Sequence, residues 1–244
     1  PTTNFKAIEQ VTVERGEGCY VWDNKGNKYL EGLAGLWCTA LGYGNQEVIA
    51  TATEQMNKLT FNHMFGGKTH QVAIDLADKL AEMIPMKDAV ISFGNSGSDA
   101  NDTHIKLLRY YHEAIGKPER RKIIARERSY HGVTVAAASL TGLPVTQNHF
   151  DLPVDALGIL RTDHPHYYRG KQGEETEDEF VDRIVGNLEA MIVAEGPDTI
   201  AAFIAEPITG ASGVIVPPDG YYQKVQAVLN RYDIMFWADE VITG

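Results

Sequence analysis

The sequence predicts an α/β fold in which a mostly parallel sheet is covered by helices on both faces. Largely apolar runs of strand length occur at residues 89–93, 122–126, 199–205 and 234–238, and segments with helical spacing separate them. Strands that are buried on both faces are apolar throughout, and parallel neighbours need helical crossovers between them. A chain of 244 residues has room for one large domain or somewhat more.

The N-terminal part of the chain has a different pattern. Residues 18–22 and 28–31 are strand-like and flank a polar, glycine-containing stretch at 23–27, which predicts a β-hairpin. We therefore treat residues 1–44 as a separate N-terminal segment. Residues 45–244 are assigned to the large domain.

Three helices are expected in the first half of the large domain. Asn45 is a suitable N-cap for a helix through Met56. A second helix, which ends before Pro85, is indicated by apolar residues three or four positions apart: Val72, Leu76, Leu80 and Met83. Residues 98–115 have the pattern of a third helix.

Two further helices are predicted in the second half. Residues 176–194 begin with a capping box that pairs Thr176 with Glu179. The face of this helix that we expect to enter the core carries Phe180, Ile184, Leu188 and Ile192. Asp219 is placed to cap a last helix through Tyr232.

The net charge of −11, from 33 acidic and 22 basic residues, argues against non-specific binding of nucleic acid or anionic membranes. It leaves an anionic ligand open, because backbone N–H groups hold phosphate without any net positive charge. No apolar run approaches the ~20 residues that span a bilayer, and no secretory signal pattern is present. The two cysteines form no disulfide framework or metal spacing. We expect a cytoplasmic protein.

The strongest chemical signal follows the first predicted strand. Ligands of open α/β sheets bind outside the carboxyl ends of the strands, and residues 94–98 (Gly-Asn-Ser-Gly-Ser) stand at that position before a helix. Glycine permits close approach of the backbone, and the helix start offers free N–H groups. Ser96, Gly97 and Ser98 are therefore candidates to hold a phosphate. A plain strand-to-helix turn with a serine cap remains the alternative for this segment taken alone.

Polar or aromatic residues follow the other three strands as well. Tyr130 could stack on an aromatic ring with His131 beside it, Glu206 could orient a ligand hydroxyl, and Asp239 could face a ring nitrogen. Each has an ordinary structural alternative in a turn or loop. Their occurrence after successive strands favours a ligand site. A carboxylate against a pyridine nitrogen keeps it protonated, so the set suggests pyridoxal 5′-phosphate as cofactor.

The segment Asp163-His164-Pro165-His166 offers two histidines as candidate metal ligands. No third ligand stands at a recognisable spacing from the two histidines. A loop is favoured here, and no metal is predicted.

Ordered motifs along nearly the whole chain resemble those of class III aminotransferases of fold type I. They are Arg15-Gly16-Glu17-Gly18, Gly35-Leu36-Trp37, Gly42-Tyr43-Gly44, Asn95-Ser96-Gly97-Ser98, Tyr130-His131-Gly132, Glu206-Pro207, Gly213-Val214-Ile215-Val216-Pro217-Pro218 and Ala238-Asp239-Glu240-Val241. The omega-aminotransferase branch, which includes β-alanine–pyruvate aminotransferase, is the most similar, and Trp37 supports it. The resemblance implies an aspartate aminotransferase-like fold. In that fold residues 1–44 would be part of a smaller α+β domain, and residues 45–244 would be a large cofactor-binding domain that is truncated at its C-terminal side.

The resemblance also implies roles and partners. Ser96, Gly97 and Ser98 would hold the cofactor phosphate, while Tyr130 and Val241 would cover the two faces of the ring. His131 would lie close by, Glu206 near the ring hydroxyl and Asp239 at the pyridine nitrogen. Trp37 and Ala211 would line the substrate pocket. The expected partners are an amine or omega-amino acid donor, a keto acid acceptor (pyruvate), and a second copy of the chain in a homodimer.

Two positions depart from the family pattern. Asp99 stands where the family usually has glutamate, and the sequence stops before the position of the Schiff-base lysine, which is expected beyond residue 244. We therefore expect the chain to be the N-terminal portion of a longer aminotransferase. Another class III reaction (aminomutase, racemase or decarboxylase) is the alternative. If the polypeptide ends at residue 244, a non-catalytic binding module for pyridoxal phosphate or phosphate is expected instead.

Overall fold

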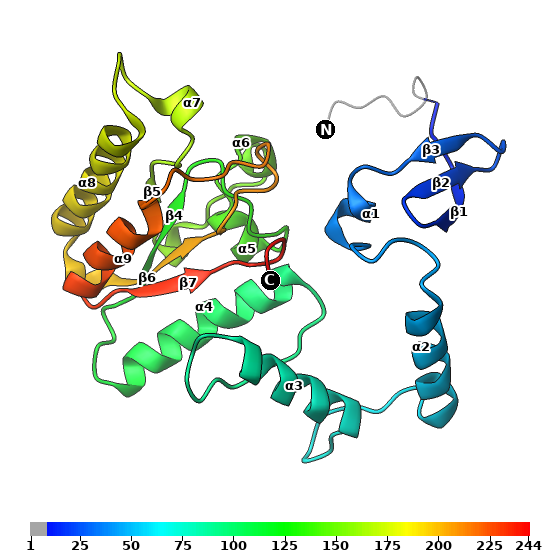
Figure 1. The fold of residues 1–244 in the computed structure, drawn as a ribbon. Helices are drawn as coiled ribbons and strands as arrows, with labels where there is room; N and C mark the ends of the chain where they lie inside the picture. Colours follow the sequence, from blue (N-terminus) through cyan, green and yellow to red (C-terminus); the bar gives the residue numbers. More distant parts are fainter. Residues whose placement is uncertain (1–8) are drawn as a thin grey trace. The chain divides into compact units, whose positions relative to one another are not determined.

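The computed structural model describes residues 9–244, which form two compact units (Figure 1). The first ends at Ser92 and the second is Phe93–Gly244. This division differs from the predicted boundary between residues 44 and 45. The predicted boundary concerns the domains of the whole protein, and it stays a prediction.

The first unit contains a small antiparallel sheet and three helices. The sheet has the order β1-β2-β3, so the predicted hairpin is present with one more strand, β1, beside it. Asn45 accepts hydrogen bonds from the N–H groups of Glu47 and Val48, both at 3.1 Å, and caps α2 as predicted. The elements are β1 (Val13–Glu17), β2 (Tyr20–Asp23), β3 (Lys28–Leu30), α1 (Ala34–Trp37), α2 (Gln46–Lys58) and α3 (Gln71–Met83).

The hairpin turn is organised by the carboxylate of Asp23. It accepts hydrogen bonds from the side-chain amide of Asn27 at 2.9 Å and the hydroxyl of Tyr29 at 2.8 Å. It also accepts from the N–H groups of Lys25 at 2.9 Å and Asn27 at 2.8 Å. These donors, the Asn27 side chain foremost, lower the pKa of Asp23 to about 2.

The second unit is built on a parallel sheet of four strands in the order β5-β4-β6-β7. Three of its strands were predicted from apolar runs, and β5 was not. The elements are α4 (Gly97–Ala114), β4 (Lys122–Arg126), α5 (Val135–Leu140), α6 (Pro144–Gln147), η1 (Asp155–Leu157), β5 (Ile159–Thr162), α7 (Tyr167–Gly170), α8 (Glu177–Glu195), η2 (Pro197–Thr199), β6 (Ile200–Ala205), α9 (Tyr221–Arg231) and β7 (Met235–Ala238).

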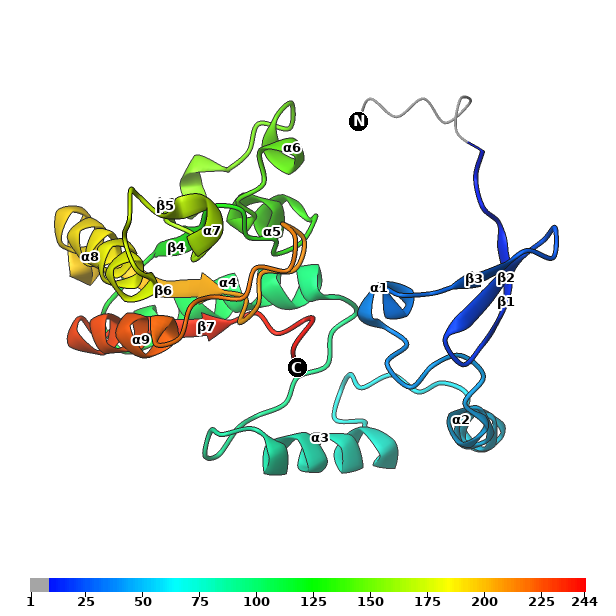
Figure 2. The same cartoon turned by 45° about the horizontal axis from the view of Figure 1, so that its top comes forward.

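Both faces of this sheet are covered, as predicted. Successive side chains of a strand point to opposite faces, so Ile124 and Phe203 pack against α8 and α9, while Ile123 and Ile204 pack with residues of α4 and α5. The two pairs of helices lie on either side of the strands (Figure 2). All six residues of β6 are buried, which explains its uninterrupted apolar sequence.

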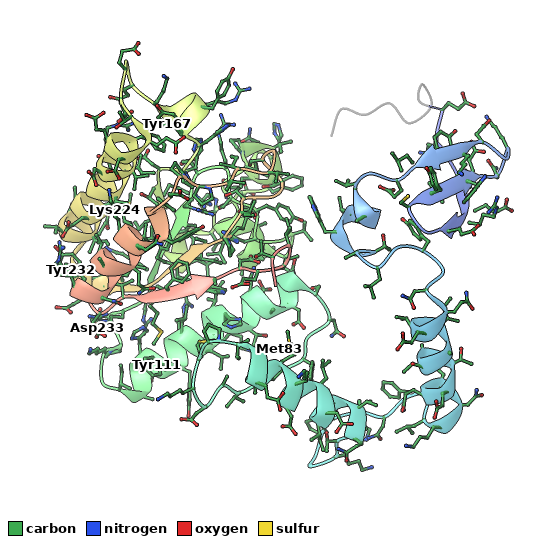
Figure 3. The ribbon with its side chains drawn as sticks, viewed as in Figure 1. Met83, Tyr111, Tyr167, Lys224, Tyr232 and Asp233 are labelled. Carbon is green, nitrogen blue, oxygen red and sulfur yellow. The ribbon has the colours of Figure 1, made fainter. Side chains whose placement is uncertain are left out.

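Helix α8 follows its prediction closely. The capping box between Thr176 and Glu179 is formed, and the four residues of the predicted core face are all buried. Polar contacts join α8 to α9 at the surface, where Lys224 contacts Asp178 at 2.8 Å and Asp182 at 2.7 Å (Figure 3).

Two predictions about local structure were wrong. Residues 89–93 form no strand, and Val90 is 93% exposed. An apolar run becomes a strand only when a neighbour satisfies its backbone groups, and no described strand pairs with this segment. Asp219 does not cap α9. Gly220, with a left-handed φ of 80°, is the N-cap, and no side chain bonds to the helix start.

We expect acid to weaken the hairpin through Asp23. Because the folded pKa lies below the ordinary value of 3.8, the ionised carboxylate stabilises the hairpin at higher pH, and this contribution is lost as the pH falls from 3.8 towards about 2. The amide NMR signals of Lys25 and Asn27 should shift as Asp23 is protonated. Asp23→Asn should abolish the transition, whereas the exposed control Glu14→Gln should retain it. An unchanged transition in Asp23→Asn would contradict this assignment.

The buried face of α8 predicts a second effect. Leu188 is 2% exposed, so Leu188→Ala should lower the free energy of unfolding by about 2–5 kcal/mol. Val193 on the same helix is 57% exposed, and Val193→Ala should change it by less than about 0.5 kcal/mol. Denaturant titration measures both. Equal effects would show that α8 does not pack as described.

Candidate functional site

Parallel strand pairing brings the ends of β4, β6 and β7 to one edge of the sheet. Ala205 of β6 is paired with Ala238 of β7, and the ladder continues by one bond, from the N–H of Asp239 to the carbonyl of Ala205 at 2.9 Å. The residues that follow these two strands, Glu206 and Asp239, are therefore held on adjacent strands. This edge is where ligands of open α/β sheets bind.

The N-terminus of α4 lies at the same place. Ser96 is the N-cap, and its hydroxyl accepts a hydrogen bond from the N–H of Asp99 at 3.1 Å. The carboxylate of Asp99 in turn accepts from the N–H of Asn95 at 3.0 Å. A Cβ added to Gly97 would lie 3.0 Å from Cγ2 of Val241, so the segment after β7 touches the start of this helix. The first N–H groups of a helix have no partner within it and attract anions.

Ser98 connects the start of α4 to the loop after β4. Its hydroxyl accepts a hydrogen bond from the N–H of Val133 at 3.0 Å. The close approach requires glycine at position 132, where φ is +128° and an added Cβ would lie 2.3 Å from Oγ of Ser98. The serine hydroxyl keeps its own proton available for donation to a ligand.

Asp239 is buried at the centre of the site. Its Oδ2 atom lies 2.7 Å from Nδ1 of His131 and accepts from Nδ2 of Asn101 at 3.1 Å. Oδ1 has only a long contact of 3.5 Å with the N–H of Val241. Burial disfavours the charged form, but the hydrogen bonds from His131 and Asn101 outweigh it and hold the pKa of Asp239 below its usual range. Asp239 is therefore an anion at neutral pH.

His131 is the neutral partner of that anion. Burial lowers the pKa of His131, against the attraction of Asp239, and its Nε2 atom is buried without a hydrogen-bond partner. An ionised carboxylate only accepts, so Nδ1 carries the proton and donates it to Asp239. The backbone N–H of His131 donates to the hydroxyl of Thr141 at 2.9 Å, which fixes the loop from its other side.

Glu206 occupies a comparable position after β6. Its carboxylate accepts hydrogen bonds from the N–H groups of Tyr130 and Gly210, both at 3.2 Å. Burial nonetheless raises the pKa of Glu206. The fully buried guanidinium of Arg126 donates to the backbone carbonyl of Glu206 at 2.7 Å and to the hydroxyl of Tyr222 at 3.0 Å.

The structure thus brings eight predicted residues together. Each of them, or its neighbour in the chain, contacts another member of the set: Ser96, Gly97, Ser98, Tyr130, His131, Glu206, Asp239 and Val241. Ala211 lies in the exposed loop after β6, next to Ser212, whose hydroxyl donates to the carbonyl of Arg128. Trp37 belongs to the first unit. The predicted ligand contacts of all ten residues stay predictions.

Sequence reasoning missed Asn101 and Arg126. Asn101 stands four residues after Gly97 and four before Ile105, so the three residues share one face of α4, and Asn101 and Ile105 are buried there. Asparagine is a poor helix former. A polar residue on a core face is a signal that could have been used. Arg126 ends the buried part of β4, after the apolar Ile123, Ile124 and Ala125, which is a signal of the same kind.

The two histidines considered for a metal lie close together, with ring centroids 5.9 Å apart. Within residues 9–244, no group of three or more His, Cys, Asp or Glu side chains could hold a metal ion. His166 precedes the short helix α7.

We expect Gly132→Ala to disrupt the site. The added methyl group would collide with Ser98, and the backbone there is unfavourable for any side chain, so the free energy of unfolding should fall by more than about 1 kcal/mol. Gly186 in α8 has open space around its Cα, and Gly186→Ala should stabilise by roughly 0.5–1 kcal/mol. Thermal unfolding compares them. Equal melting temperatures of Gly132→Ala and the unsubstituted chain would refute the close contact.

The model of the Aminotransferase class-III family matches residues 4–244. A probable gamma-aminobutyrate transaminase 2, mitochondrial, of Oryza sativa subsp. indica is 52% identical over 238 residues, which are 97% of this chain and 48% of that protein. A chloroplastic gamma aminobutyrate transaminase 3 of Solanum lycopersicum is 51% identical over 238 residues, which are 97% of this chain and 45% of that protein. The chain spans about half the length of the curated relatives it matches.

Solved structures agree with the predicted fold. The omega transaminase from Pseudomonas jessenii in complex with PMP has a TM-score of 0.96 at 50% identity, covering 100% of this chain and 54% of its own. A transaminase with L-Ala has a TM-score of 0.93 at 52% identity, covering 96% and 55%. These likenesses confirm an α/β fold of the type I pyridoxal-phosphate enzymes. The chain belongs to the class III aminotransferase family, whose cofactor is pyridoxal 5′-phosphate.

Proposed function

We propose that the whole protein transfers an amino group from an amine or omega-amino acid to a keto acid, with pyridoxal 5′-phosphate as cofactor. The observation that carries this proposal is the buried, ionised Asp239 beside the N-terminus of α4, in a chain of this family. An anion holder and a fixed carboxylate are the two features that a phosphorylated pyridine requires.

The residues at the site fit this cofactor. The start of α4 supplies backbone N–H groups and the hydroxyls of Ser96 and Ser98 for the phosphate. Asp239 offers Oδ1, which is free of strong hydrogen bonds, to the ring nitrogen. Tyr130 and Val241 are the proposed contacts of the two ring faces, and Glu206 that of the ring hydroxyl. When bound, the cofactor supplies a cationic ring that withdraws electrons from a carbon attached to the substrate nitrogen.

The electrostatics of this chain suit that chemistry. Asp239 stays ionised because His131 and Asn101 donate to it, and an anion in a buried site stabilises a proton on a facing ring nitrogen. His131 is neutral and adds no competing positive charge. The hydroxyl of Ser98 and the loop at Gly132 hold the phosphate end at a fixed position relative to Asp239.

For the donor we propose an omega-amino acid such as gamma-aminobutyrate, or a simple amine, because the relatives' names give gamma-aminobutyrate transaminases and omega transaminases at 50–52% identity. For the acceptor we propose pyruvate, whose amination product, alanine, is named in one of the similar structures. Trp37 and Ala211 are the proposed contacts of the donor.

Assembly and location are further parts of the proposal. We propose a homodimer, as the resemblance to the family implies. No helix among residues 9–244 is long and apolar enough to cross a membrane. The cytoplasmic location stays a prediction, and the plant relatives carry mitochondrial and chloroplastic in their names.

The decisive test is Asp239→Asn in the whole protein. Loss of the anion removes the stabilisation of the protonated ring, and kcat for amine-to-pyruvate transfer should fall by about a hundredfold or more. The control is Glu240→Gln, which removes the neighbouring exposed carboxylate and should leave kcat unchanged. Unchanged turnover in Asp239→Asn would mean that the role of Asp239 is misassigned.

The visible absorbance of the cofactor-loaded whole protein provides the accompanying measurement. It should bleach when an amine is added and return with pyruvate. Cofactor absorbance that never responds to any amine would favour a binding module, and no absorbance with cofactor supplied would contradict the proposal.

A further inference from the structure

We propose that Asn101 is the positioning residue that fixes the Asp239 carboxylate and selects Oδ1 as the oxygen that meets the cofactor ring nitrogen. This inference rests on the proposed function, because the ring nitrogen belongs to the proposed cofactor.

The side-chain amide of Asn101 joins three segments that are far apart in the sequence. Asn101 lies in the second turn of α4, and its Nδ2 atom donates to the backbone carbonyl of His131 at 2.7 Å and to Oδ2 of Asp239 at 3.1 Å. The amide nitrogen carries two protons, so each acceptor receives one. Asn101 is 5% exposed, and water does not compete for these bonds.

The two oxygens of Asp239 are consequently unequal. Oδ2 accepts from both Asn101 and Nδ1 of His131, whereas Oδ1 has only the 3.5 Å contact with Val241. The carboxylate cannot rotate about its Cβ–Cγ bond without losing two short hydrogen bonds in a buried place. Oδ1 therefore stays available in one orientation.

A neutral donor is required at position 101. An aspartate would have nearly the same shape, but its oxygens would face the carbonyl of His131 and the carboxylate of Asp239, and like charges in a buried site raise each other's pKa. Two titratable groups interact with Asp239, namely His131 on the loop after β4 and Glu206 after β6. The guanidinium groups of Arg126 and Arg161 act on His131 and help to lower its pKa. None of them replaces the amide as a second donor to Oδ2.

The experiment compares Asn101→Asp, Asn101→Ala and the control Thr103→Ala in the whole protein. Thr103 lies on the exposed side of the same helix. The first readout is the affinity for pyridoxamine 5′-phosphate, which binds without a covalent bond to the protein. We expect a loss of about tenfold for Asn101→Ala and about a hundredfold for Asn101→Asp, and no loss for Thr103→Ala.

The second readout separates electrostatics from packing. The ¹⁵N shift of the ring nitrogen in labelled, bound pyridoxamine 5′-phosphate should move towards the unprotonated value in both Asn101 variants, because a more basic Asp239 draws the proton away. A purely structural role predicts that Asn101→Asp, which conserves volume, is milder than Asn101→Ala. The inference would be overturned if Asn101→Asp had a smaller effect than Asn101→Ala. It would also be overturned if both variants kept the ¹⁵N shift and the affinity of the unsubstituted protein.

A third readout needs no ligand. The imidazole Nδ1 proton of His131 donates to Asp239, and its NMR signal should respond to protonation of Asp239 at a pH about one unit higher in Asn101→Ala. An unchanged response would overturn the inference even when affinity falls. If the unsubstituted protein binds no pyridoxamine 5′-phosphate, the proposed function fails, and this third readout alone still shows whether Asn101 holds Asp239.

Discussion

The candidate site depends on the parallel pairing of β6 with β7. Ala205 is paired with Ala238, and the ladder continues into the bond between the N–H of Asp239 and the carbonyl of Ala205. Because side chains alternate along a strand, a slip of one residue would turn Asp239 to the opposite face. The buried apolar residues on both faces of β6 make such a slip costly, so the core of the sheet determines where the carboxylate lies.

Local electrostatics rather than net charge govern this site. A chain with a net charge of −11 repels anions at long range, yet the start of α4 presents backbone N–H groups at close range. At the other end, Asp239 is kept ionised in a buried place by two donors on one oxygen. The N-terminus of α4 therefore attracts an anion at one end of the site, and the Asp239 carboxylate attracts a cation at the other. A phosphorylated pyridinium ring carries the matching charges.

The loop after β4 contains no helix or strand, and four side chains bind its backbone. The hydroxyl of Ser98 accepts a hydrogen bond from the N–H of Val133, and the amide of Asn101 donates to the carbonyl of His131. The hydroxyl of Thr141 accepts from the N–H of His131, and the carboxylate of Glu206 accepts from the N–H of Tyr130. Four side chains, two on α4, one at the end of α5 and one after β6, thus replace the hydrogen bonds that regular structure would supply. A loop held this way presents its side chains as precisely as a strand does. One fold can host many reactions, so the site bounds the chemistry more narrowly than the fold does.

The sequence by itself determined three strands of the parallel sheet, the longer helices and the residue types at the site. Apolar runs predicted β4, β6 and β7, and the capping box predicted the start of α8. Most residues of the candidate site were predicted because they directly follow a predicted strand. Those signals are local. The tertiary structure alone decided that residues 89–93 pair with no strand among residues 9–244, that Gly220 rather than Asp219 is the N-cap of α9, and that Asn101 meets Asp239 across 138 positions of sequence. Strand pairing and buried hydrogen bonds depend on which partner lies opposite, and that is fixed only when the chain packs.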